Sequence, residues 1–146
     1  MLVRVAGNNL FPQVKPRPNS RDRTNGVFVS DSKCDLRSIL LPASDLESSL
    51  AFYRDGLGLG VRMRDRDDYA ELSAGSIKLA LAIPADHPVP ESALPVFRSE
   101  DVSVAVSRLL AAGATVLSGP VEGAHEIRAV LRDPSGNPFV VYRSRA

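Results

Sequence analysis

Residues 45–53 read DLESSLAFY, and residues 101–109 read DVSVAVSRL. Each stretch opens on an aspartate and then carries apolar side chains at helical spacing, so each predicts an amphipathic helix. The matching positions are Leu46 with Val102, Leu50 with Val106, and Tyr53 with Leu109. Ser44 and Glu47 fit a capping box at the start of the first helix. Gly56 and Gly113 are expected to end the two helices, because glycine adopts the left-handed conformation at little cost.

Short runs of strand-forming residues surround both predicted helices in the same order, one before the helix and three after it. The first set is Ser38–Leu41, Leu59–Met63, Tyr69–Ser73 and Ile77–Ile83, and the second is Leu94–Arg98, Thr115–Leu117, Ile127–Leu131 and Phe139–Tyr142. Hairpin turns are predicted at residues 74–76 and at residues 133–136, the latter a type I turn with proline second. The chain therefore predicts two tandem βαβββ units, which must pack together to bury a core.

The first 35 residues differ from the rest, with several prolines, a basic stretch from Lys15 to Arg23 and weak periodicity. We expect an N-terminal arm that is flexible or an extension, with the alternative that Leu2–Val5 or Val27–Val29 adds an edge strand to a partner. The domain boundaries that follow are 1–35 for the arm, 36–84 for module 1, 85–93 for a proline-rich linker, and 94–143 for module 2.

Composition restricts the partners and the compartment of this 146-residue chain. A net charge of +1 argues against a polyanion-binding surface, and therefore against nucleic acid as the main partner. No apolar run approaches the roughly 18 residues that span a bilayer, so no membrane partner is expected. Cys34 is the only cysteine, which excludes an intrachain disulfide and favours a reduced, cytoplasmic protein.

Two motifs resemble one known family. Residues 45–53 followed by Leu57-Gly58-Leu59, and the later stretch DPSGNPF at residues 133–139, resemble the first helix and the last hairpin of the vicinal oxygen chelate superfamily. That superfamily includes glyoxalase I, extradiol dioxygenases and bleomycin-resistance proteins. The resemblance covers Leu36 to Arg143 and implies an α+β fold, in which tandem βαβββ modules form a curved mixed sheet around a cleft with helices on the outer face. It also implies a homodimer.

Metal-dependent members of this family carry one ligand on the first and last strand of each module, usually His, Gln or Glu. The matching positions in this chain are Ser38, Ala80 or Ala82, Leu94 and Val140. None of these side chains is a good ligand for a divalent metal, so we expect no metal and no cofactor. The alternative is a displaced site built from His87, His125, Glu71 and Glu126, although the two histidines are expected to be solvated in loops.

Strand alternation assigns one face of each strand to the cleft. The predicted lining is Ser38, Leu40, Tyr69, Glu71, Ala80, Ala82, Leu94, Val96, Arg128, Val140 and Tyr142. Small and apolar walls with a few polar groups are typical of a small-molecule site, although the same side chains could simply fill the cleft.

Three functions remain open for such a cleft. The first is a metal-independent protein that sequesters an antibiotic or metabolite, with a small, apolar, neutral or anionic ligand. The second is a metal-free isomerase, cyclase or lyase that uses Tyr69, Glu71, Arg128 or Tyr142, and contact between Glu71 and Arg128 across the cleft would favour it. The third is a mainly structural dimer. A metal-dependent lyase or dioxygenase that uses the displaced site is the alternative to these three metal-free functions.

Overall fold

A computed structural model of the chain describes residues 33–145. Module 1 consists of β1 (Asp35–Pro42), α1 (Leu46–Ala51), β2 (Val61–Asp65), β3 (Tyr69–Ala74) and β4 (Ile77–Ala82). Module 2 consists of β5 (Leu94–Arg98), α2 (Val102–Ala111), β6 (Thr115–Glu122), β7 (Glu126–Arg132) and β8 (Pro138–Ser144). A π-helical turn, η1 (Phe52–Gly56), extends α1, and a short 3₁₀ turn, η2 (Pro84–Asp86), begins the linker.

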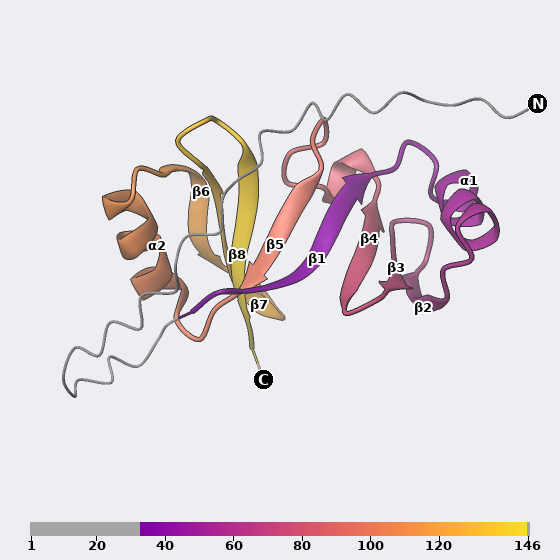
Figure 1. The fold of residues 1–146 in the computed structure, drawn as a ribbon, viewed down its shortest axis with the longest axis horizontal. Helices are drawn as coiled ribbons and strands as arrows, with labels where there is room; N and C mark the ends of the chain where they lie inside the picture. Colours follow the sequence, from indigo (N-terminus) through magenta and orange to yellow (C-terminus); the bar gives the residue numbers. More distant parts are fainter. Residues whose placement is uncertain (1–32, 146) are drawn as a thin grey trace, which may run out of the picture.

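The strands form one mixed sheet in the order β2-β3-β4-β1-β5-β8-β7-β6. Within each module the first strand runs parallel to the last, β1 beside β4 and β5 beside β8, while β1 and β5 meet antiparallel at the centre. The second half of the sheet therefore repeats the first in reverse order, with α1 and α2 at opposite ends (Figure 1). The predicted α+β fold of tandem βαβββ modules is confirmed.

Both helices begin at the predicted aspartates. The Asp45 carboxylate accepts a hydrogen bond from the backbone N–H of Ser48 at 3.1 Å, and Asp101 accepts one from Val104 at 3.0 Å. Each aspartate thus satisfies an amide that the first helical turn leaves without a partner. The predicted capping box of Ser44 with Glu47 is wrong, because Asp45 is the cap and Glu47 forms an ion pair with Arg64 of β2 instead.

The two helices end differently. Gly113 follows α2 with a φ of +106°, as expected of a glycine stop. The first helical segment ends at Gly56 through the π-helical turn, but the left-handed residue is Gly58, with a φ of +70°. The helical segment ends at the predicted residue, but the left-handed glycine lies two positions later than predicted, at Gly58.

Strand β6 departs most from the prediction, because it continues past Leu117 through Gly119 to Glu122. Its pairing with β7 shifts register between Val116 and Ser118 and again between Ser118 and Val121. Gly119 lies within the second shift and has a φ of +85°. A Cβ added at Gly119 would lie 2.5 Å from the carbonyl oxygen of Arg128, so only glycine fits there without displacing backbone. The strand predicted to end at Leu117 therefore continues through Gly119-Pro120, which form an irregularity inside a longer strand.

The predicted arm overlaps the fold at its C-terminal end. Strand β1 begins at Asp35, three residues before the predicted start at Ser38 and within the segment assigned to the arm. Its pairing partner there is Arg98 of β5. The rest of the arm prediction, including the alternative edge strands, lies outside the described residues.

Each helix covers an equivalent apolar core on the outer face of the sheet. In module 1, Leu46 and Leu50 of α1 pack on Leu72 and Leu81 of the sheet. In module 2 the equivalent cluster joins the helix to the sheet through Val102, Ala105, Val106, Ala129, Leu131 and Val141. A third cluster lies on the inner face and consists of Leu94, Val130 and Val140, with Leu40, Val89 and Val96 packed against it. The outer cores hold the helices, and the inner cluster forms the base of the candidate site.

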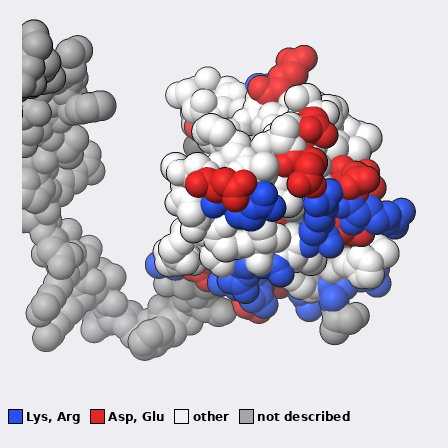
Figure 2. All heavy atoms as spheres, turned by 90° about the vertical axis from the view of Figure 1, so that its right-hand side faces the viewer, with Lys and Arg blue, Asp and Glu red and all other residues white. Residues whose placement is uncertain are grey.

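The surface at the module 1 end mixes charges of both signs. Figure 2 shows blue and red side chains next to one another on this face. The ion pairs of this region include Arg64 with Glu47, and Arg54 with Asp55 at 2.8 Å. No helix in the described part of the chain is long and apolar enough to cross a membrane.

Candidate functional site

A hollow of about 470 Å³ opens on the inner face of the sheet, between the two modules. Strands of both modules and the linker contribute to its wall. The lining residues are Ser38, Leu40, Asp65, Tyr69, Ala80, Asp86, Pro88, Val96, His125, Glu126, Arg128 and Val140. Its volume lies within the roughly 300–1,000 Å³ that is usual for small-molecule sites.

Seven of the eleven residues that the sequence assigned to the cleft line this hollow: Ser38, Leu40, Tyr69, Ala80, Val96, Arg128 and Val140. The other four lie elsewhere. Leu94 is fully buried in the inner apolar cluster, where Val89 of the linker packs against that cluster. Ala82 is buried beside its pairing partner Tyr69. Glu71 and Tyr142 are half-buried outside the lining.

The positions that correspond to metal ligands in the family lie on adjacent strands. Leu40 pairs with both Ala80 and Leu94, and Val96 pairs with both Ser38 and Val140. The side chains at the family's ligand positions offer one hydroxyl group and otherwise only hydrocarbon, whereas catalytic divalent metals are held mainly by carboxylate, imidazole or thiolate side chains. These residues therefore do not fit a catalytic metal.

The alternative metal site is not assembled in the described residues either. Within residues 33–145, no three side chains of His, Cys, Asp or Glu lie close enough together to hold a metal ion. His125 and Glu126 do line the hollow, but Glu71 lies outside its lining and the His87 ring is engaged with backbone groups.

The rim of the hollow is more acidic than the sequence indicated. It carries the carboxylates of Asp65, Asp86 and Glu126 against one guanidinium, Arg128, whose Nη1 lies 3.4 Å from a Glu126 oxygen. The exposed side chain of His125 also lies in the wall of the hollow. Sequence reasoning missed Asp65 and Asp86 because they lie at a strand end and in the linker, where strand alternation no longer predicts a direction.

Three polar side chains form a half-buried network on the inner face of β3 and β4. The Tyr69 hydroxyl donates to a Glu71 oxygen at 2.8 Å, and Lys78 Nζ lies 3.0 Å and 2.9 Å from the two Glu71 oxygens. Burial, followed by the negative charge of Glu71, raises the pKa of Tyr69 well above its usual 10. Tyr69 therefore stays protonated and presents a hydrogen-bonding group to the hollow.

Glu71 and Arg128, which the sequence suggested as a pair across the cleft, have other partners. Glu71 pairs with Lys78, and Arg128 pairs with Glu126. The ion pair Lys78–Glu71 connects neighbouring strands on the same face, which is the role of an ordinary cross-strand pair. The contact that would have favoured acid–base catalysis is therefore not formed.

His87 is buried rather than solvated, with 4% of its surface exposed, which corrects the prediction for this side chain. Its Nδ1 accepts a hydrogen bond from the backbone N–H of Val89 at 3.1 Å, so Nε2 carries the proton and faces the Leu40 carbonyl oxygen at 3.5 Å. Burial lowers the pKa of His87 below the usual 6.5. A neutral imidazole thus connects the linker to β1 at the edge of the hollow.

Comparison with known proteins agrees with this architecture. The family model of a glyoxalase-like domain matches residues 38–142. A protein of Mycolicibacterium smegmatis, described only as uncharacterized, is 36% identical over 108 residues, which are 74% of this chain and 92% of the relative.

Solved structures share the fold at low sequence identity. A glyoxalase/bleomycin resistance protein/dioxygenase superfamily member from Vibrio splendidus 12B01 is 17% identical, with a TM-score of 0.55 over 77% of this chain and 100% of that one. The methylmalonyl-CoA epimerase of Streptomyces coelicolor, in complex with 2-nitronate-propionyl-CoA, is 20% identical, with a TM-score of 0.57 over 76% and 97% of the two chains. This chain belongs to the glyoxalase-like domain family and thus to the vicinal oxygen chelate superfamily.

Proposed function

We propose that this chain binds a small organic molecule in the hollow between its modules and does so without a metal, in the manner of a sequestering protein for an antibiotic or metabolite. The proposal rests on the side chains that this chain carries at the positions where metal-dependent members of the family hold their metal. These positions are Ser38, Ala80 or Ala82, Leu94 and Val140, on neighbouring strands, and three of them, Ser38, Ala80 and Val140, line the hollow. An apolar base beneath a polar rim is the usual construction of a small-molecule site.

The rim favours a neutral ligand over an anionic one. Three carboxylates face one guanidinium, and that guanidinium is already close to Glu126, so an anion would meet net repulsion. A neutral molecule with an apolar body and hydroxyl or amide donors would match both parts of the hollow. Arg64 of the neighbouring strand β2 adds no positive charge to the hollow, because its guanidinium is held by Glu47 and Asp67.

Two fluorescent probes of similar shape test this charge preference. N-phenylnaphthylamine is neutral and apolar, and anilinonaphthalene sulfonate is its anionic analogue. We expect the neutral probe to bind more tightly to the full chain. Tighter binding of the anionic probe would contradict the proposed ligand class.

Variants then test whether the hollow is the site. Ala80→Leu places extra volume into its base, where overpacking should weaken binding of the neutral probe by about tenfold. Ala112→Leu makes the same change at an exposed position after α2 and should leave binding unchanged. Val96→Phe is a second filling variant, in case Ala80→Leu perturbs the fold. Equal affinity in all three variants would place the bound probe outside the hollow.

The metal is tested separately, by native mass spectrometry of protein purified without added metal and then supplied with zinc, nickel, manganese or ferrous iron. The proposal expects no stoichiometric metal, and a tightly held ion would overturn it. The same spectra give the subunit number, and we propose a homodimer from the family resemblance, acting in the cytoplasm. The metal-free isomerase, cyclase or lyase has less support, because Glu71 is occupied by Lys78 and Tyr69.

A further inference from the structure

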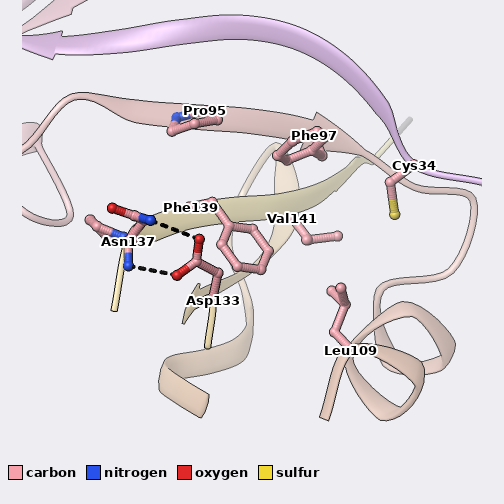
Figure 3. Close-up of a pocket in the computed structure, with 9 residues that line it drawn as sticks. Cys34, Pro95, Phe97, Leu109, Asp133, Asn137, Phe139 and Val141 are labelled. Atoms are coloured by element: carbon pink, nitrogen blue, oxygen red, sulfur yellow. Dashed lines mark hydrogen bonds between the residues drawn. The ribbon is translucent and has the colours of Figure 1, made fainter. Parts of the chain in front are cut away.

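A second hollow, of about 360 Å³, lies on the outer face of the sheet between α2 and strands β5 and β8. We refer to it as the outer groove. Its lining residues are Cys34, Pro95, Phe97, Leu109, Asp133, Asn137, Pro138, Phe139 and Val141. Figure 3 shows Cys34 and Leu109 at one end, Asp133 and Asn137 at the other, and the two phenylalanines between them.

The outer groove is apolar along most of its length. Phe97 and Phe139 meet edge to face at a centroid distance of 6.0 Å, and both remain partly exposed. At the polar end, Asp133 accepts hydrogen bonds from the Asn137 backbone N–H at 2.9 Å and from its side-chain amide at 2.8 Å, which Figure 3 marks with dashed lines. Because these polar groups already satisfy one another, whatever covers the groove gains by burying apolar surface rather than by hydrogen bonding.

The chain that leads into the groove wall indicates which segment covers the outer groove. Cys34 is the second described residue and forms part of the groove wall, so the preceding chain departs from the groove itself. The nearest apolar residues upstream are Val27-Phe28-Val29, separated from Lys33 only by the polar run Ser30-Asp31-Ser32. Phe28 stands six positions before Cys34. An extended chain of that length spans about 20 Å, which is enough for the segment to fold back over the groove.

We propose that the outer groove is the docking site of residues 27–29 of the same chain, with Phe28 placed against Phe97 and Phe139. Residues 27–29 are the apolar segment closest to the groove in sequence, and the tether is short. A tether of this kind raises the local concentration of the segment, so that three apolar residues compete well against an external partner. The docked segment would close the exposed end of the module 2 core, and this interaction is independent of the ligand proposed for the inner hollow.

Cys34 provides a reporter for the test, because it is the only cysteine in the chain and lines the groove. The rate at which its thiol reacts with Ellman's reagent is measured on the full native chain. In Phe28→Asp the segment should leave the groove, and the rate should rise about tenfold or more. The matched control is Phe11→Asp, which makes the same change in the same N-terminal segment, far from Cys34 in sequence. It should react at the wild-type rate.

Two further measurements keep the outcome interpretable. Phe28→Leu preserves an apolar side chain and should restore most of the protection, whereas a variant that had merely lost its fold would react at the rate of urea-unfolded protein. Equal rates for Phe28→Asp and wild type would overturn the proposal. Protection that disappears on dilution would also overturn it, because the covering segment would then come from a second copy.

Discussion

The buried imidazole of His87 makes the stability of this protein depend on pH in a direction that the structure dictates. Burial lowers the pKa of His87 below the 6.5 of an exposed histidine, so between these two values the unfolded chain binds a proton that the folded chain does not. The contribution of this side chain is therefore fully present above about pH 6.5 and decreases as the pH falls below it. It stops decreasing once the folded-state pKa is passed.

The size of the effect follows from the contacts. One proton limits the slope to about 1.4 kcal/mol per pH unit. At pH 8, His87→Gln removes the ring nitrogen that accepts from the Val89 N–H at 3.1 Å, together with a close-packed ring, which should cost about 1–3 kcal/mol of unfolding free energy. The difference between wild type and His87→Gln should then shrink as the pH is lowered from 8 toward 5, because only the wild type loses the contribution of the neutral ring.

Urea unfolding at several pH values measures this difference, since carboxylates that titrate in both proteins cancel. Proton NMR follows the same group directly. The chain has two histidines, so His125→Gln assigns the His87 resonance and also controls for the loss of a histidine at an exposed position. A difference in unfolding free energy that stays constant with pH, or grows toward acid, would refute the assignment of His87 as a buried neutral side chain.

Three further changes can be followed by urea unfolding at neutral pH. Leu94→Ala removes a fully buried side chain from the inner cluster and should cost about 2–5 kcal/mol, and a cost below about 1 kcal/mol would mean that this cluster is not closed by the linker. Gly119→Ala brings a Cβ within 2.5 Å of a β7 carbonyl oxygen at a φ of +85° and should cost at least about 1–3 kcal/mol, whereas Gly56→Ala, which meets nothing within 4 Å, should be close to neutral. Asp101→Ala removes the cap of α2 and should cost about 0.5–2 kcal/mol, and an unchanged stability would show that Val104 finds another acceptor.

The parts of this molecule that depend on neighbouring residues in the chain were predictable from its sequence. The helix starts at Asp45 and Asp101, the glycine stop at 113 and the turn in which Gly136 N–H donates to the Asp133 carbonyl oxygen at 2.9 Å all rest on hydrogen bonds or φ angles within a few residues, although the predicted cap of the first helix, Ser44 with Glu47, was wrong. Strand alternation identified most of the lining of the inner hollow, because the direction of each side chain is a local property of the strand. The repeat then required the two modules to pack together.

Only the tertiary structure decided which side chains are buried by distant segments and which charged side chains pair with one another. Alternation assigns Leu94 to the inner face, but it cannot indicate that the linker buries it there together with His87. It likewise cannot choose Lys78 over Arg128 as the partner of Glu71, or place Asp86 on the rim. The burial of Leu94 and the position of Asp86 depend on the path of the linker, which has no period of two, and the choice of charge partner depends on the distances at which the strands finally place their side chains.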